Sequence, residues 1–184
     1  MSRRWPAKGK HTDPLDVHPE TMHARHIDGI TIRLLRNGDT ATVSALFERL
    51  GPRSRERRFC GAKPRLSADE LRLLARVDAE HHVLVGYLGD DPEPVGIARI
   101  VREGDSAEVA FAVADDYQGR GIGTVLTREL AADARAAGVT ELVATVCGDN
   151  PRAVSLLARV ANSLQSRWQG GEQELVAQLE RRTS

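Results

Sequence analysis

A glycine-rich segment that joins a strand pattern to a helix pattern constrains this chain more than any other feature. Residues 118–124 read QGRGIGT and place three glycines at alternate positions. Glycine lets the backbone approach a ligand closely, and the first amides of a helix point outward, unpaired, at the positive end of the helix dipole. The segment therefore predicts a cradle for a pyrophosphate at the start of a helix.

The segment departs from two other phosphate-binding motifs at particular positions. A dinucleotide-binding fingerprint needs glycine or alanine at position 124, where Thr124 stands, and normally follows the first strand of its fold. A P-loop ends in Gly-Lys-Ser or Gly-Lys-Thr, which this segment lacks. What remains is glutamine, two free positions, glycine, one free position and glycine, formed by Gln118, Gly121 and Gly123.

Strand and helix patterns alternate along the rest of the chain. Apolar residues with a period of two predict strands over residues 30–34, 83–88, 95–101, 107–114 and 142–146. Helical spacing with start and stop signals predicts helices over residues 40–50, 68–77, 122–137 and 151–160. Residues 163–179 predict a closing hairpin around Gly170 and Gly171. The order strand, helix, strand between residues 107 and 146 predicts a right-handed crossover.

The composition fits one folded domain behind a different N-terminal segment. With 184 residues, 41% of them hydrophobic, the chain can bury one substantial core. Residues 1–28 contain three prolines, four of the six histidines and few large apolar side chains. We therefore expect a flexible extension over residues 1–28 and the domain over residues 29–180. The histidine spacings match no usual ligand motif, so no metal site is expected.

Charge and cysteine content restrict the classes of binding partner and the cellular compartment that we expect for this protein. Lysine and arginine number 26, and aspartate and glutamate also number 26, so no nucleic-acid partner is expected. No apolar run approaches the roughly 18 residues of a membrane helix, and no secretory signal is present, so we expect a cytoplasmic protein that binds no membrane. Cys60 and Cys147 show no pairing pattern, which favours a reducing compartment. The working start, Met1 or Met22, and the assembly, monomer or homodimer, stay open.

The strand, the glycine loop and the helix together resemble the GNAT superfamily of acetyltransferases. The acetyl-CoA loop of that family has glutamine or arginine, two free positions, glycine, one free position, and glycine or alanine, which Gln118, Gly121 and Gly123 fit. The resemblance covers about residues 30–179. It implies an α/β (α+β) domain with a mixed, largely antiparallel sheet of six to seven strands flanked by helices, and acetyl-CoA as co-substrate.

A narrower similarity points to the catalytic domain of bacterial Pat-type protein lysine acetyltransferases. It runs through residues 46–50, 54–55, 58–59, 77–78, 82 and 107–110. The resemblance implies that the Val113 backbone amide binds the thioester carbonyl. It implies a cofactor-binding set of Val113, Gln118, Gly119, Arg120, Gly121, Ile122, Gly123, Thr124 and Asn150.

Glu108 is the candidate general base. A lysine amine with a pKa of about 10.4 is almost fully protonated at neutral pH, and only the neutral amine attacks a thioester. Glu108 lies upstream of the loop on the same predicted strand, and Pat-type enzymes are thought to use a glutamate at the matching position. A glutamate in a strand is also often just solvated. Burial beside its small apolar neighbours would raise the Glu108 pKa toward a useful range.

The acceptor stays open between a protein lysine and a small amine such as a polyamine, aminoglycoside or amino acid. A catalytically silent CoA-binding or interaction module is a further alternative. It is kept because a tyrosine common in the family is replaced by Leu157. The basic run of residues 49–65 could meet an acidic acceptor or simply be a solvated face. His81 and His82 could line the site or pack in a hairpin, and Cys147 is not favoured as a nucleophile.

Overall fold

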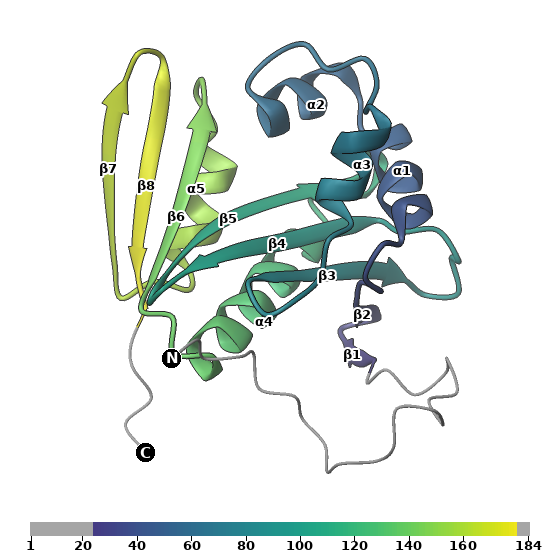
Figure 1. The fold of residues 1–184 in the computed structure, drawn as a ribbon, viewed down its shortest axis with the longest axis horizontal. Coiled ribbons are helices and arrows are strands. Elements are labelled where there is room, and N and C mark those ends of the chain that lie inside the picture. Colours follow the sequence, from purple (N-terminus) through teal and green to yellow (C-terminus); the bar gives the residue numbers. More distant parts are fainter. Residues whose placement is uncertain (1–23, 180–184) are drawn as a thin grey trace.

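The computed structural model describes residues 24–179, and its centre is one eight-stranded sheet in the order β1-β2-β3-β4-β5-β6-β8-β7 (Figure 1). Every neighbouring pair is antiparallel except β5 and β6, which are parallel. This confirms the mixed, largely antiparallel sheet, with one strand more than expected. The strands are β1 Arg25–Ile27, β2 Ile30–Leu34, β3 His81–Leu88, β4 Gly96–Glu103, β5 Ser106–Val113, β6 Glu141–Cys147, β7 Ser163–Gln169 and β8 Glu172–Gln178.

Helices cover both faces of this sheet (Figure 1). They are α1 Thr40–Glu48, α2 Pro52–Phe59, α3 Ala68–Leu74, α4 Ile122–Ala136 and α5 Pro151–Ala158, with a short 3₁₀ turn, η1, at Asp115–Tyr117. The expected caps are present: Asp39 accepts from the Thr42 amide, and Ser67 and Glu70 form a capping box. These local signals explain why most helices begin where the sequence predicts.

The helix α2 was not expected from the sequence. Gly51 and Pro52 were interpreted as the stop of the preceding helix, and the basic stretch that follows has no apolar stripe. In the structure Gly51 is the N-cap of α2 and Pro52 occupies its first turn. Proline suits that position because its missing N–H would have had no intrahelical acceptor. The same two residues therefore end one helix and begin the next.

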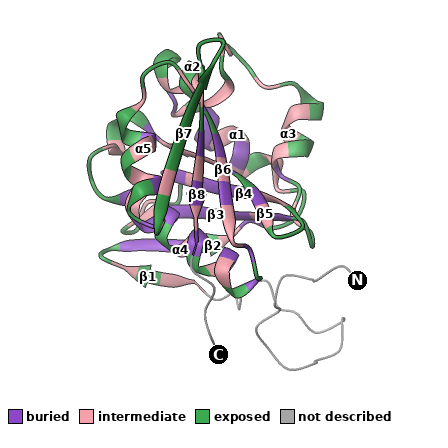
Figure 2. Cartoon of the chain, turned by 90° about the vertical axis from the view of Figure 1, so that its left-hand side faces the viewer, coloured by how far each residue is buried: buried purple, intermediate pink, exposed green. Residues whose placement is uncertain are grey.

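Side-chain alternation along the strands divides the core between the two faces of the sheet. On β3, Leu84 joins the large cluster under α4 and α5, whereas Val83 and Val85 join a smaller cluster under α1 and α3. Figure 2 shows buried residues concentrated on the central strands, with the edge strand β7 mostly exposed. Within residues 24–179, none of the helices is both long and apolar enough to cross a bilayer.

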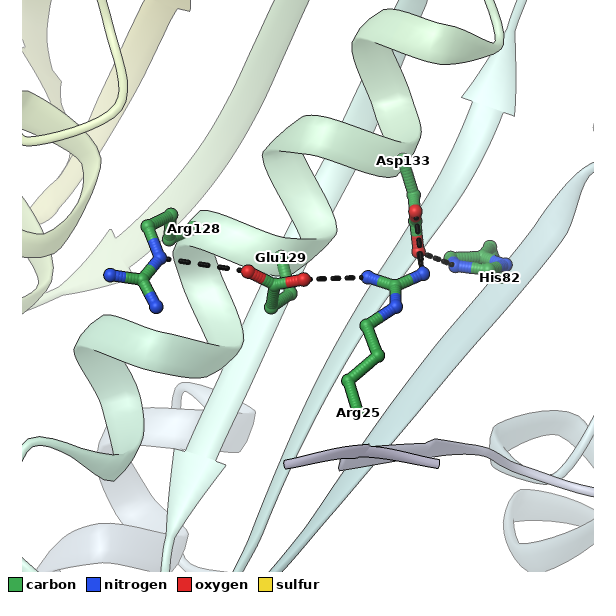
Figure 3. Close-up of polar contacts among 5 residues, drawn as sticks. All are labelled: Arg25, His82, Arg128, Glu129 and Asp133. Atoms are coloured by element: carbon green, nitrogen blue, oxygen red, sulfur yellow. Dashed lines mark hydrogen bonds and ion pairs between the residues drawn. The ribbon is translucent and has the colours of Figure 1, made fainter. Parts of the chain in front are cut away.

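The N-terminal boundary of the fold lies earlier than the sequence suggested. Residues 25–27, expected to belong to the flexible extension, form β1 and pair with β2. Arg25 donates to Glu129 at 2.9 Å and to both carboxylate oxygens of Asp133 at 2.7 and 2.8 Å (Figure 3). His82 lies 2.9 Å from the same Asp133. This network joins β1 and β3 to α4, and no short-range pattern in the sequence predicts it.

The other expectations for the extension fall on residues 1–23, which lie outside the described residues. The candidate metal-binding histidines His11, His18 and His23 are among them. His26 is described, and its Nδ1 lies 2.9 Å from the Thr31 hydroxyl across the first hairpin.

We predict a pH-dependent contribution of Asp133 to stability. Burial would raise the Asp133 pKa, but the hydrogen bond from His82 and the ion pair with Arg25 outweigh it and lower the pKa below 3.8. The stabilisation is therefore present above that pH and is lost as the pH falls through the lowered pKa. Asp133→Asn should lower the free energy of unfolding by about 1–2 kcal/mol at pH 7, between values for exposed and buried pairs.

Urea unfolding at pH 7 and pH 3 measures this effect. The difference between wild type and Asp133→Asn should shrink at pH 3, and an equal difference at both pH values would contradict the assignment. Asp90→Asn, in the exposed turn after β3, serves as the control and should change stability at neither pH.

Candidate active site

A cleft opens where the two parallel strands of the sheet separate. β5 and β6 pair only over Ser106–Glu108 and Glu141–Val143. Beyond this point β5 stays paired with β4 as far as Val113, and β6 stays paired with β8 as far as Cys147. The gap is part of a cavity of about 880 Å³ lined by β5, β6, α2, α5 and the glycine loop. A cavity of this size lies within the range of small-molecule sites.

The unpaired edge of β5 offers backbone donors to this cleft. The Ala114 amide donates to the Val95 carbonyl at 2.9 Å, on the β4 side. Because amide directions alternate along a strand, the N–H groups of Val113 and Phe111 point the other way, where β6 has separated. The sequence interpretation named Val113 alone, whereas the strand presents a row of amides.

The glycine loop lies at the end of that row and leads into α4. Gly119 and Gly121 have φ values of +79° and +83°, a left-handed conformation that side chains other than glycine rarely adopt. The first α4 hydrogen bond runs from the Val125 amide to the Gly121 carbonyl. The amides of residues 122–124 therefore have no acceptor within the helix and point out of its N-terminus. This is the predicted cradle, with the positive end of a 15-residue helix behind it.

A close approach of α4 to the sheet fixes the position of this cradle. A Cβ atom on Gly96 of β4 would lie 2.8 Å from Leu126 Cδ1 and 3.0 Å from Ile122 Cγ2. A side chain at this position would force Leu126 and Ile122, in the first turns of α4, to shift. The packing on β4 thus sets where the amides of the helix N-terminus stand relative to the cleft.

Most of the predicted cofactor-binding residues line the cleft. They are Val113, Gln118, Gly119, Gly121, Ile122, Gly123, Thr124 and Asn150. Asn150 also caps α5, because its side chain accepts from the Ala153 amide at 3.2 Å. Arg120 is exposed and does not line the cleft, and its guanidinium lies 5.0 Å from the centre of the Tyr117 ring.

The Gln118 side chain is held by residues from α2, β5 and α5. Its amide nitrogen donates to Ser54 Oγ at 3.1 Å and to the Val113 carbonyl at 3.2 Å. Arg152 of α5 donates to its amide oxygen at 2.5 Å. Ser54 and Arg152 lie 64 and 34 positions away, so only the fold brings them to the loop.

Glu108 stands at the vertex where β5 and β6 part. It is the last β5 residue paired with β6, lines the cleft and is exposed. Glu108 is therefore not buried among its small apolar neighbours, because the strands diverge at this residue. Glu108 shares a sheet face with Ala110 and Ala112, as predicted, and the β4 register adds Arg99 to that face.

The side chains of His81, His82 and Leu157 make their contacts away from the cleft. His81 and His82 pair with Asp78 and Asp133 and do not line the cleft. Leu157, at the position of the missing tyrosine, is fully buried, and its neighbour Leu156 faces the cleft instead.

The basic run of residues 49–65 is not one continuous patch. Arg49 pairs with Asp91, Arg55 lies over the Phe47 ring, and Lys63 pairs with Glu70. Two neighbouring members of the run, Arg57 and Arg58, line the cleft. The solvated-face interpretation holds for exposed members such as Arg53.

The expectation that the two cysteines are unpaired is wrong. Cys60 and Cys147 form a disulfide across 87 positions of sequence, with their Cα atoms 5.3 Å apart. Cys60 caps the C-terminal end of α2, and Cys147 ends β6. They meet because α2, the helix that the sequence analysis missed, packs against β6. The bond joins two walls of the cleft and leaves no free thiol at Cys147 for nucleophilic attack.

The comparisons with known proteins agree with this geometry. A family model described as the acetyltransferase (GNAT) family matches residues 45–161. The chain belongs to this family. Acetyl-CoA is therefore its co-substrate, and the resemblance inferred from the glycine loop is confirmed.

Two relatives and one solved structure show which members of the GNAT family this chain resembles. Acetyltransferase Pat from Mycolicibacterium smegmatis is 46% identical over 84 residues, covering 44% of this chain and 25% of that protein. Acetyltransferase PA5475 from Pseudomonas aeruginosa is 34% identical over 118 residues, covering 61% of this chain and 63% of that protein. The chain thus spans a quarter of one relative and under two thirds of the other. The crystal structure of the GNAT domain of S. lividans PAT matches with a TM-score of 0.74 and 25% identity, over 82% of this chain and 90% of that one.

We predict that Gly121→Ala weakens acetyl-CoA binding. Alanine in this left-handed conformation costs about 1–2 kcal/mol, and relaxing it would turn the helix amides away from the cleft. Isothermal calorimetry should show a dissociation constant raised by about fivefold or more, the affinity equivalent of about 1 kcal/mol. Gly61→Ala is the control, since its site has open space and no positive φ. Equal affinities for Gly121→Ala and the control would argue against the cradle.

We also predict that the disulfide forms in the protein purified without reductant. Thiol titration of the denatured chain should then detect no free thiol before reduction and two afterwards, because the sequence holds two cysteines. Reduction should lower the free energy of unfolding by about 2–4 kcal/mol. A variant carrying both Cys60→Ser and Cys147→Ser should be insensitive to reductant. Two titratable thiols in the untreated protein would refute the bond.

Proposed function

We propose that the protein transfers the acetyl group of acetyl-CoA to the side-chain amine of a lysine in a protein, with Glu108 as general base. The separation of β5 from β6 carries the proposal, because it brings the helix cradle, the row of strand amides and Glu108 to one cleft. The similarity to Acetyltransferase Pat supports the Pat-type resemblance from which the lysine acceptor is inferred.

Backbone groups would hold the cofactor in this mechanism. The amides of residues 122–124 at the start of α4 would bind the pyrophosphate, as favoured by the helix dipole. The Val113 amide would bind the thioester carbonyl and stabilise the negative charge that develops on its oxygen during attack. These contacts use main-chain atoms and leave the side chains free to deal with the acceptor.

Glu108 would remove a proton from the attacking ammonium group. The neutral amine then forms a bond to the acetyl carbon, the carbon–sulfur bond breaks, CoA leaves as a thiolate, and the second proton of the nitrogen passes to solvent. Val113 lies five positions after Glu108, about 16 Å along an extended strand. An amine bound beside Val113 would therefore lie beyond the direct reach of Glu108, and its proton would pass along several water molecules, whereas an amine beside the Phe111 amide would lie closer to Glu108. A CoA thiolate is stable enough near neutral pH for a dedicated acid to be unnecessary.

We predict that Glu108→Gln lowers kcat by at least about tenfold, because general-base catalysis usually contributes roughly a hundredfold or more. CoA release from acetyl-CoA, measured with a panel of lysine peptides, proteins and small amines, tests this. Glu103→Gln changes an exposed carboxylate at the far end of β4 and should leave the rate unchanged.

Three outcomes separate the alternatives. Acetyl-lysine found in a protein by mass spectrometry supports the proposal, and turnover with soluble amines alone replaces it by a small-molecule activity. Tight CoA binding without turnover on any acceptor would instead indicate a silent binding module. Unchanged kcat in Glu108→Gln would remove Glu108 from the mechanism.

A further inference from the structure

Two arginines beside Glu108 have no role in the transfer step. Arg99 of β4 is 9% exposed, and its Nε has no hydrogen-bond partner. Arg58 of α2 is half-buried, and its guanidinium lies 5.0 Å from the centre of the Phe59 ring. Burial lowers the pKa of both arginines, of Arg58 to about 10, and the Glu108 charge opposes that shift in each.

The surrounding protein leaves this pair of cations incompletely neutralised. Within the described part of the chain, neither guanidinium forms an ion pair with a carboxylate. Asp78 also acts on Arg99, but it pairs with Arg76 at 2.5 Å and with His81 at 2.8 Å. One buried and one half-buried positive charge thus face one exposed negative charge, an arrangement that is unfavourable without a further anionic partner.

A small cavity lies in front of the two side chains. It has a volume of about 40 Å³ and is enclosed by α1, α2, α3 and the β4–β5 face of the sheet. Apart from Arg58 and Arg99 its walls are apolar. A cavity needs about 10–15 Å³ per water molecule, so this one holds about three waters or one carboxylate group.

The small cavity adjoins the acetyl-CoA cleft. Both are lined by Arg58, Phe59, Ala110 and Ala112. Arg99 and Glu108 lie on the same sheet face, on neighbouring strands. An acceptor whose amine reaches the cleft beside Glu108 can therefore place a second group in the small cavity.

We propose that Arg99 and Arg58 bind a carboxylate of the acceptor, so that the preferred substrate is an amine carried beside a carboxylate. Guanidinium groups suit this partner because their planar forks match the two oxygens of a carboxylate. The apolar walls strengthen the contact by excluding water. The inference rests on the proposed acetyl transfer and specifies its acceptor. The carboxylate can come from an acidic residue next to an acceptor lysine or from a free carboxyl group of a small amine.

Matched acceptor pairs test the inference and separate the two sources. The first pair is a blocked peptide Ala-Lys-Asp-Ala and its Ala-Lys-Asn-Ala counterpart, and the second is Nα-acetyl-lysine and its amide. The ratio of kcat/KM within each pair is measured by CoA release. We expect the carboxylate form of at least one pair to be favoured by about tenfold or more, the usual effect of one charge-assisted hydrogen bond. The pair with the larger ratio identifies the source.

Variants of the two arginines supply the decisive comparison. Arg99→Gln and Arg58→Gln should each bring the ratio toward one, and Arg99→Lys should restore part of it. Arg53→Gln, an exposed arginine of the same helix α2 that lines neither cavity, should keep the wild-type ratio. Far-ultraviolet circular dichroism reports whether each variant is folded. A purely structural role would lower both members of a pair equally and leave the ratio unchanged, which would overturn the inference.

Binding measurements keep the test independent of turnover. Nα-acetyl-lysine and its amide are titrated by calorimetry into the protein saturated with CoA. Tighter binding of the carboxylate form, lost in Arg99→Gln, supports the subsite even if no acceptor is acetylated and the proposed function fails. Turnover without any preference in either pair, or equal binding of the two forms when the peptide pair also shows no preference, refutes the subsite and leaves the acetyl transfer standing.

Discussion

The short parallel pairing between β5 and β6 is the constraint on which the cleft depends. Each strand keeps its antiparallel neighbour, so the two part after Glu108 and leave main-chain donors and acceptors facing a gap inside the sheet. Buried backbone groups without partners are costly. A ligand with its own amides and carbonyls can complete such an edge, much as an added strand would, and the pantetheine arm of CoA has that chemistry. The fold and the cofactor are thus complementary at the level of the main chain.

The two ends of the cleft use different parts of the molecule. Around the cradle, the groups that face the cofactor are mostly backbone amides, placed by the close contact of α4 with Gly96. Around the vertex, the polar groups are side chains: Glu108, Arg58 and Arg99. Backbone geometry survives most substitutions, whereas side-chain chemistry changes with each one. A family built this way can keep one cofactor and vary its acceptors.

The features that could be predicted from the sequence are those encoded within a few neighbouring residues. The glycine loop, the caps at Asp39 and Ser67, and the alternation of β5 all belong to this class, and the confirmed fold follows from them. The helix α2 was not predicted because the signal at Pro52 suits both the end of one helix and the start of the next. β1, the disulfide and the contacts of Gln118 depend on residues many positions apart. The sequence left open whether Glu108 is buried or solvated, because its exposure depends on where two distant strands stop pairing.

The bond between Cys60 and Cys147 makes the composition of the buffer an experimental variable for this protein. Reagents that detect released CoA by reacting with thiols exclude dithiothreitol, so such assays observe the bridged cleft. Mass-spectrometric assays run with dithiothreitol observe a cleft whose α2 wall is tethered only by packing. Because Arg58 sits two residues before Cys60, acceptor preferences recorded in the two conditions describe two different surfaces. Comparisons between substrates are meaningful only when the oxidation state of Cys60 and Cys147 is held constant.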